Sequence, residues 1–322
     1  MKQYYVLGNG AEWCYFSWKG ALDIDKSIHF TNGSIPFSGP RFLKRMCFAH
    51  YSRRFNNKRR LPFKRIWYSR ILKGLNIYSG DENYLIIYDR NKLLFDLNFF
   101  NYVRKKNPRI RIAYLFSNIV KYTGALNMGI VNKLNMYFDK VFAFDKTDAV
   151  KYNFSYFPLI YTKSVPMDNK EPEYDLFYIG KAKDRYEQLI RVFEKAQEEG
   201  LKCDFNIVGV PKEKQLYRDI IHYDQPLSYQ EVLKRMNNAK CIVDMIQGQS
   251  TAFTIKTCEA IIYDKKLITS NENVKTELFF NDNMMMVFSG ESSISDFLLR
   301  ETTPFNKSSK DLFSPYTLFG LL

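Results

Sequence analysis

The chain has 322 residues, of which 46% are hydrophobic and 25% charged, and its formal net charge is +14. This composition excludes a disordered chain, and no apolar run reaches the roughly 18 residues of a membrane-spanning helix. The length predicts about two domains.

The first half of the chain alternates apolar runs with segments of helical character. Strands separated by helices predict a parallel sheet that is covered on both faces. The polar stretch 161–173 contains two prolines and is the predicted linker, so the first domain is expected to span residues 1–162. Its strands are predicted at 2–7, 28–30, 84–88, 111–116 and 140–144, and its helices at 98–106, at 131–137 and in two pieces over 41–75.

The charge excess is concentrated between Asp25 and Asp81, an interval with 13 Lys and Arg residues and no acidic residue. Aromatic and aliphatic residues are interleaved with these charges. One interpretation is a solvated helix face, but such a face usually mixes both signs of charge. A second is a nucleic-acid-binding surface, which is possible on charge alone, although no nucleic-acid-binding motif occurs. We favour a third interpretation, in which residues 41–75 face an anionic membrane surface.

The second half repeats the alternation and predicts a second domain over residues 174–300. Ser228 and Glu231 have the spacing of a capping box at a helix start. Residues 301–322 form a tail that we expect to pack back on the first domain. The other predicted elements are strands at 174–180, 205–209, 239–246 and 266–269 and a helix at 185–200.

The loop 247–260 connects the predicted buried strand 239–246 to a helix. Its small polar residues would place backbone N–H groups at the positive end of that helix, which suits a phosphate. Thr254, Lys256 and Glu259 fall in the first turns of the helix, and we interpret the loop as a nucleotide-sugar site. An ordinary connection that binds nothing is the alternative.

Polar residues also follow three strands of the first half, namely Asp89, Asn118 and Asp145. Ligands of parallel sheets bind beyond the carboxyl ends of the strands, so these residues are candidates for an acceptor site. Helix capping is the commoner role of Asp and Asn at such positions. A turn signal, Gly8-Asn9-Gly10, ends the first strand, and Asn9 and Gly10 join the acceptor-side candidates.

Five stretches, taken in order, resemble bacterial GT-B glycosyltransferases that build lipopolysaccharide and capsule sugars. The likeness covers about residues 84–300. Where the family often has Gly-Leu-Thr-Leu-Arg, this chain has AFTIK, with Lys256 in the place of Arg; where it often has Trp, this chain has Ser117. The stretches are 138–152 (FDKVFAFDKTDAVKY), 178–185 (YIGKAKDR), 226–229 (PLSY), 248–260 (GQSTAFTIKTCEA) and 265–271 (KKLITSN).

The resemblance implies an α/β fold of two Rossmann-like doubly wound domains facing a cleft. It also implies transfer of a sugar from a nucleotide-sugar donor to a saccharide or polyprenyl-linked acceptor. The expected location is cytoplasmic, peripheral on the inner face of the cell membrane. Such enzymes generally use helix ends and cations in place of a metal. The five cysteines and three histidines also lack the paired spacing of a zinc site, so we expect neither metal nor cofactor. Because no nucleic-acid-binding motif occurs, we also expect no nucleic-acid partner.

The resemblance further implies roles for single residues. Glu259 would accept hydrogen bonds from the ribose hydroxyls, and Arg185, shortly after Gly180, would offset the charge of the leaving diphosphate. The residues implied to bind the diphosphate are Gln249, Ser250, Thr251, Thr254 and Lys256.

The base of the reaction depends on its stereochemistry. An inverting enzyme needs a base on the first domain, for which Asp89 is our first candidate, followed by Asp145 and His29. A retaining enzyme needs none. Two other functions remain open: a nucleotide-sugar epimerase, and a non-catalytic protein that binds a membrane surface.

Overall fold

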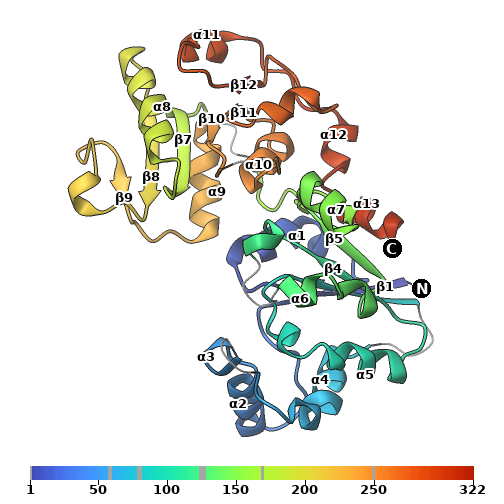
Figure 1. Ribbon diagram of the computed structural model, residues 1–322. Helices are drawn as coiled ribbons and strands as arrows, with labels where there is room; N and C mark the ends of the chain where they lie inside the picture. The colour runs from blue at the N-terminus through green and yellow to red at the C-terminus, as the bar shows by residue number, and fades with distance from the viewer. Residues whose placement is uncertain (1, 57–59, 78–81, 123–127, 168–169, 249–250) are drawn as a thin grey trace. The chain divides into compact units, whose positions relative to one another are not determined.

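A computed structural model describes residues 2–56, 60–77, 82–122, 128–167, 170–248 and 251–322. The chain divides into two compact units (Figure 1). The first unit comprises Met1–Pro158 and Leu318–Leu322, and the second comprises Leu159–Thr317.

The first unit is built on a sheet of six parallel strands in the order β2-β1-β3-β4-β5-β6. Val6 of β1 lies opposite Phe30 on one side and Ile86 on the other. Consecutive residues of β1 and β3 are buried, as expected for strands covered on both faces. The strands are β1 (Lys2–Gly8), β2 (Ile28–Asn32), β3 (Glu82–Tyr88), β4 (Arg111–Leu115), β5 (Lys140–Ala143) and β6 (Ser155–Tyr156).

The helices of the first unit differ from the prediction at two places. Helix α1 was missed, although its buried residues Cys14, Ser17, Trp18 and Ala21 have helical spacing. The predicted helix 131–137 is wrong, because the chain there forms only the short helices at 128–131 and 134–136. The helices are α1 (Glu12–Ile24), α2 (Arg41–His50), α3 (Arg53–Asn56), η1 (Lys64–Trp67), α4 (Tyr68–Leu75), η2 (Lys92–Phe95), α5 (Asn98–Lys106), η3 (Val120–Tyr122), α6 (Met128–Val131), η4 (Leu134–Met136) and α7 (Lys146–Tyr152).

The second unit also contains six parallel strands, in the order β12-β11-β10-β7-β8-β9. Together the two sheets confirm the predicted α/β class with two Rossmann-like units. The strands are β7 (Tyr174–Lys181), β8 (Cys203–Val208), β9 (His222–Tyr223), β10 (Ala239–Asp244), β11 (Lys266–Thr269) and β12 (Met285–Val287); the helices are α8 (Tyr186–Glu198), η5 (Lys212–Lys214), α9 (Tyr229–Asn237), α10 (Ile255–Ile262), η6 (Glu272–Thr276), α11 (Ile294–Leu299) and α12 (Lys307–Asp311). The last helix, α13 (Pro315–Leu321), begins in the second unit, and its residues from Leu318 on belong to the first.

Apolar residues of α8 and α11 share one core cluster with Leu176 and Tyr178 of β7. Successive strand residues point to opposite faces, so Phe177 faces the other side of the sheet, where α9 contacts β7 and α10 contacts β10. Ser228 caps α9 by accepting a hydrogen bond from the backbone N–H of Glu231 at 3.2 Å, which confirms the predicted helix start.

The stretch that was expected to be a linker, 161–173, lies within the second unit. The backbone N–H of Tyr161 donates to the carbonyl of Phe313 at 2.9 Å. The backbone N–H groups of Ser164 and Val165 donate to the hydroxyl of Tyr263 at 3.1 and 3.2 Å. Among the described residues, these three N–H groups lie outside the strands, and the bonds give them the partners that a sheet would otherwise supply.

The expected tail 301–322 is divided between the units, with only Leu318–Leu322 belonging to the first. There, the ring of Phe319 stacks on Tyr4 with centroids 3.5 Å apart. Arg111 Nη1 donates to the carbonyl of Leu322 at 2.8 Å.

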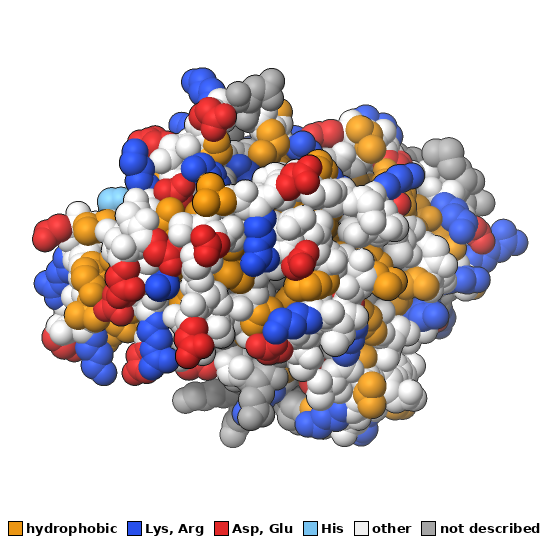
Figure 2. Space-filling view, turned by 90° about the horizontal axis from the view of Figure 1, so that it is seen from above, with side chains coloured by type: hydrophobic (Ala, Val, Ile, Leu, Met, Phe, Trp, Pro, Cys, Tyr) orange, Lys and Arg blue, Asp and Glu red, His pale blue; other side chains and the backbone are white. Residues whose placement is uncertain are grey.

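Positive and negative side chains are interspersed over the face shown in Figure 2. No helix in the described part of the chain is long and apolar enough to cross a membrane.

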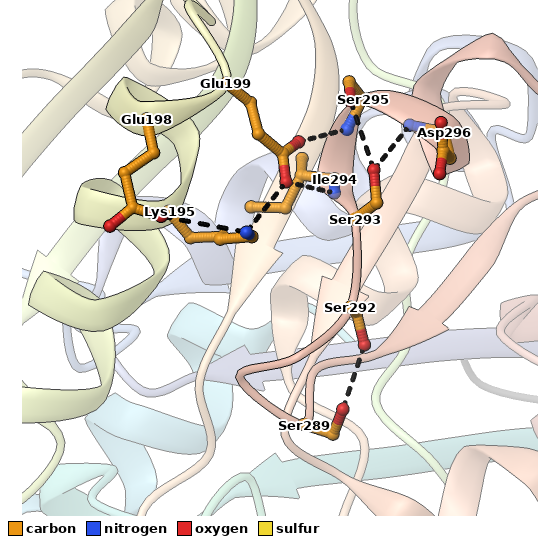
Figure 3. Close-up of polar contacts among 9 residues, drawn as sticks. All are labelled: Lys195, Glu198, Glu199, Ser289, Ser292, Ser293, Ile294, Ser295 and Asp296. Carbon is orange, nitrogen blue, oxygen red and sulfur yellow. Dashed lines mark hydrogen bonds and ion pairs between the residues drawn. The ribbon is translucent and has the colours of Figure 1, made fainter.

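The C-terminal end of α8 is joined to the start of α11 by polar contacts (Figure 3). Glu199 accepts from the backbone N–H groups of Ile294 at 3.3 Å and Ser295 at 2.6 Å. Lys195 forms an ion pair with Glu199 at 3.5 Å. Burial disfavours the charged form of Glu199, but these donors hold its pKa below the ordinary value. Ser293 caps α11 through the N–H of Asp296.

Candidate functional site

The strand order of the second unit reverses at β7. From β7 the chain proceeds to β8 on one side and later places β10 on the other side. In doubly wound sheets, ligands bind outside the carboxyl ends of the strands at such a switch point. A ligand of this unit is therefore expected at the end of β7, at Gly180 and Lys181, and at the end of β10, at Asp244.

Arg185 connects these two strand ends. Its Nη1 donates to the carbonyl of Met245 at 2.7 Å, and Nη2 and Nε donate to the carbonyl of Lys181 at 2.9 and 3.2 Å. The guanidinium is half-buried at the start of α8. Since a guanidinium carries five N–H donors in a fixed plane, it holds the two loops at a set separation while keeping a permanent positive charge between them.

Lys256 is the second cation at this point. It lies in the first turn of α10, with Nζ 5.1 Å from the centroid of the Tyr178 ring. A Cβ on residue 180 would lie 3.4 Å from this Nζ and 3.1 Å from the Tyr178 hydroxyl, so Gly180 leaves the space that the ammonium uses. Burial lowers the pKa of Lys256, and the charge of Arg185 lowers it further, whereas Asp244 and Glu259 oppose the shift.

Asp244, which the sequence analysis missed, anchors the loop that follows β10. Its Oδ2 accepts from the hydroxyls of Thr254 at 2.7 Å and Thr257 at 3.1 Å. The Thr254 hydroxyl also accepts from the backbone N–H of Lys256 and so caps α10. An Asp inside an otherwise apolar run was the available signal. The predicted phosphate ligand Thr254 is thereby engaged in building the helix N-terminus.

Glu259 is buried, with 2% of its surface exposed, and accepts a short hydrogen bond from the Tyr229 hydroxyl. The Tyr229 hydroxyl lies 3.0 Å from that of Tyr161. Burial raises the pKa of Glu259 to about 7, although the Tyr229 hydrogen bond and the charge of Lys256 oppose the rise. The sequence did not reveal this pair of tyrosines, because they lie 98 and 30 residues from Glu259 (259 − 161 and 259 − 229).

Two loops lie side by side at the open end of this site. Lys183 Nζ donates to Gln247 Oε1 at 2.5 Å. Gly248 has a φ of +56°, and a Cβ there would lie 3.6 Å from Asp184 Oδ2. Two of the predicted ligands, Gln249 and Ser250, follow directly and lie outside the described residues, and Thr251 is half-buried.

Three sources of positive potential therefore meet at one edge of the second sheet: the Arg185 guanidinium, the Lys256 ammonium and the N-terminus of the eight-residue helix α10. Positive helix ends and paired cations stabilise phosphate groups. The arrangement suits an anion with several oxygens.

The switch point of the first unit lies between β1 and β3. Asp89 follows β3 with no exposed surface. Its Oδ1 accepts from the backbone N–H of Ser117 at 3.0 Å and from the Ser117 hydroxyl, which in turn accepts from Asn9 Nδ2 at 3.2 Å. Asp89 Oδ2 has no hydrogen-bond partner among the described residues. Burial raises the pKa of Asp89 to about 6 against the effect of the Ser117 hydrogen bonds.

The network joins the loops that follow β1, β3 and β4. Asn9 also accepts from the backbone N–H of Ala11, and the backbone N–H of Gly10 donates to Asn32 Oδ1 at 3.0 Å. Of the predicted acceptor-side residues, the structure thus brings Asn9 together with Asp89, with Gly10 adjacent.

The remaining acceptor-side candidates, and His29 as a candidate base, have local partners. Asp145 caps α7 by accepting from the backbone N–H of Asp148 at 3.1 Å. Asn118 Oδ1 accepts from the N–H of Ile119. His29 lies within β2 with Nε2 2.9 Å from Gln3 Oε1, and burial lowers its pKa.

In the described part of the chain, no three His, Cys, Asp or Glu side chains cluster closely enough to hold a metal ion. Two carboxylates two residues apart are a possible metal-binding pair, and the chain has such an Asp-x-Asp sequence at residues 23–25, at the end of α1. Asp23 forms an ion pair with Lys19, and Asp25 accepts from Ser27. All five cysteines are buried thiols.

No protein-family model matches the chain, and no curated protein matches it in sequence. Solved structures match its fold. An α,α-trehalose 6-phosphate synthase from Burkholderia multivorans has a TM-score of 0.50 at 10% identity, covering 97% of this chain and 92% of that chain. OtsA in its apo form also has 0.50 at 10% identity, covering 97% and 94%. A UDP-N-acetylglucosamine 2-epimerase from Rickettsia bellii has 0.45 at 11% identity, covering 100% and 96%.

At such identities the likeness shows the fold alone. The chain has the GT-B, glycosyltransferase-like fold.

Proposed function

We propose that the protein is a glycosyltransferase that moves a sugar from a nucleotide-sugar donor to a saccharide or lipid-linked acceptor in bacterial surface polysaccharide synthesis. The observation that supports this most directly is the meeting of Arg185, Lys256 and the α10 N-terminus at the switch point of the second unit. The resemblance of residues 178–185 and 248–260 to the glycosyltransferase family points to the same place.

In this proposal the second unit stabilises the leaving nucleoside diphosphate. Negative charge grows on the diphosphate as the glycosidic bond breaks, and fixed cations stabilise that charge most in the transition state. Arg185 is already oriented by two carbonyl groups, and Lys256 by the Tyr178 ring. These residues therefore need little reorganisation when the donor binds. No metal and no cofactor are required.

Glu259 remains the proposed ribose-binding residue. Its carboxyl accepts from the Tyr229 hydroxyl, so it meets the ribose only where the donor reaches the Tyr229 side of α10. A carboxylate has acceptor positions beyond the one that Tyr229 occupies. A ribose hydroxyl would fill one of them, and a sugar that lacks this hydroxyl would leave it unpaired, which makes the contact selective.

Asp89 remains the proposed base if the reaction inverts. Because it has no exposed surface, an acceptor hydroxyl would pass its proton by way of the Ser117 hydroxyl, which is already bonded to Asp89. A pKa of about 6 suits proton transfer near neutral pH. If the reaction retains, the same network serves to hold Asn9 and Ser117 in place.

We also propose that the first unit associates with the inner face of the membrane. Phe42 and Met46 lie one turn apart on α2 with 63% and 56% of their surfaces exposed. Arg41, Lys44 and Arg45 are exposed on the same helix, which has no acidic residue. Apolar side chains flanked by cations favour an anionic interface, where each Lys or Arg contributes about 1 kcal/mol.

A screen of UDP-, GDP-, CMP- and dTDP-sugars tests the function, with release of the nucleotide measured with and without acceptor. We expect slow release of one nucleotide, accelerated by a saccharide or lipid-linked acceptor. Conversion of the donor to another sugar nucleotide without acceptor would instead identify an epimerase. If no nucleotide stabilises the protein against heat, the proposal fails. Flotation with anionic vesicles tests the membrane claim, which is refuted if no binding occurs at low salt.

A further inference from the structure

A cavity of about 650 Å³ opens in the first unit, away from the Asp89 network. Its size falls in the range of small-molecule sites. Three parts of the chain form its walls: the segment before and through η1, the start of α5 with the residues that precede it, and the α6–η4 segment. The lining residues are Arg60, Leu61, Pro62, Phe63, Lys64, Arg65, Tyr68, Phe95, Asp96, Leu97, Asn98, Asn101, Tyr102, Lys105, Ile130, Lys133 and Tyr137.

The lining carries five cations and one carboxylate. The carboxylate, Asp96, accepts from the Tyr68 hydroxyl at 2.5 Å. Of the cations, only Lys64 is buried, and its Nζ donates to the carbonyl of Leu61. The other four are exposed, and none forms an ion pair with a described residue: Arg60, Arg65, Lys105 and Lys133.

The start of α5 adds to this positive potential. The nine-residue helix begins at Asn98 without a side-chain cap and without an acidic residue in its first turn. Asn98 and Asn101 both line the cavity, and their amides can donate hydrogen bonds. The positive end of a helix and several unpaired cations around one cavity favour an anion with several oxygens.

One edge of the cavity is apolar. Phe63, which lines the cavity, has 79% of its surface exposed, and Ile66, which follows three residues later outside the lining, has 63% exposed. Phe63 has a φ of 61°, a conformation that is costly for a residue with a side chain. His50 holds this turn through both ring nitrogens. Its Nδ1 accepts a hydrogen bond from Trp67 Nε1 at 2.8 Å. The proton is therefore on Nε2, which donates to the carbonyl of Pro62 at 2.7 Å. The apolar edge is therefore built into a fixed turn.

We propose that this cavity binds the phosphate or diphosphate of an amphiphile, with its apolar chain lying over Phe63 and Ile66. The cations and the α5 N-terminus meet the phosphate oxygens, and the volume leaves room for a first group attached to them. Identifying this amphiphile with the lipid-linked acceptor rests on the proposed glycosyltransferase function; binding itself does not.

Calorimetric titration of the full chain with farnesyl diphosphate, inorganic pyrophosphate and farnesol tests the site. We expect farnesyl diphosphate to bind at least about 10-fold more tightly than pyrophosphate, a difference of about 1.4 kcal/mol, and farnesol not to bind. The double variant Lys105→Glu/Lys133→Glu should weaken farnesyl diphosphate by about 10-fold or more. The control Lys106→Glu/Lys140→Glu, with the same change of charge outside the cavity, should bind as the wild type does.

The donor site also attracts diphosphates, so the variant Lys256→Ala is titrated in parallel. Its retention of farnesyl diphosphate supports the cavity. Loss in Lys256→Ala with retention in the Lys105→Glu/Lys133→Glu variant would overturn the inference. Equal affinity for pyrophosphate and farnesyl diphosphate would overturn the part played by the apolar edge.

Vesicle binding tells whether the protein recognises a phosphate monoester or any anionic membrane surface. Phosphatidylcholine vesicles that carry polyprenyl phosphate should lose binding in the Lys105→Glu/Lys133→Glu variant, whereas phosphatidylglycerol vesicles should not; equal losses overturn the inference. Nucleotide-sugar hydrolysis, measured on the same samples, separates the two proposals. Hydrolysis without binding of farnesyl diphosphate refutes this site alone, and binding without nucleotide affinity refutes the glycosyltransferase proposal alone.

Discussion

Replacing Glu259 by Gln removes a carboxyl that titrates differently in the folded and unfolded chain. Burial raises the pKa of Glu259 from 4.5 to about 7. Between these pH values the folded state holds a proton that the unfolded chain has released, so stability falls as the pH rises through this window. At about 1.36 kcal/mol per pKa unit, the wild type loses roughly 3 kcal/mol, and Glu259→Gln does not.

The assay must report on the second unit by itself. The three tryptophans, Trp13, Trp18 and Trp67, all lie in the first unit, so their fluorescence follows that unit alone. Hydrogen exchange of peptides from β10 and α10, measured by mass spectrometry between pH 4.5 and 8 and corrected for intrinsic exchange, gives the local free energy of opening. Tryptophan fluorescence in urea then serves as an internal control that the substitution should not change.

The comparison is the difference in opening free energy between Glu259→Gln and the wild type. We expect the difference to grow in favour of the variant as the pH rises through the window. The exposed residue Glu213 supplies a matched control, because Glu213→Gln also removes one carboxyl from the second unit. Superimposable pH profiles for the wild type and Glu259→Gln would refute the burial argument. Tyr229→Phe should push the pKa of Glu259 higher still, because it removes the hydrogen bond that opposes the rise.

Three further predictions address the other parts of the molecule. Lys256→Ala should weaken binding of the donor nucleotide by roughly 10- to 100-fold in calorimetry, the loss of one charged hydrogen bond; unchanged affinity would remove Lys256 from the site. If Asp89 is the base, kcat/KM should rise with pH through about 6 and this limb should vanish in Asp89→Asn; a retained limb would assign the base elsewhere. Glu199→Gln should cost about 1 kcal/mol of stability at neutral pH, a deficit that disappears as the pH falls below 4.5, because the depressed pKa of Glu199 stabilises only while the group is charged. Thermal melts of both proteins across this pH range measure the difference in stability, and a difference that stays constant with pH would contradict the charge-based account.

The sequence by itself determined the class of the fold and the positions of most of its strands. Apolar runs such as 84–88 and 241–245 are buried on both faces, and that pattern needs only neighbours along the chain to be recognised. Ser228 marked a helix start for the same reason, because a cap acts over three residues. The loop 247–260 was interpreted as an anion site from its position between a strand and a helix, and that interpretation stays a prediction.

Only the tertiary structure decided how the site is made. Arg185 and Met245 are 60 residues apart, and Glu259 meets Tyr229 across 30 residues. Such pairs depend on the order of strands in the sheet, which long crossover connections establish and local patterns do not encode. For the same reason Asp244 was overlooked as the anchor of its loop. The sequence could locate the carboxyl ends of strands, but the sheet order decided which of those ends lie next to each other.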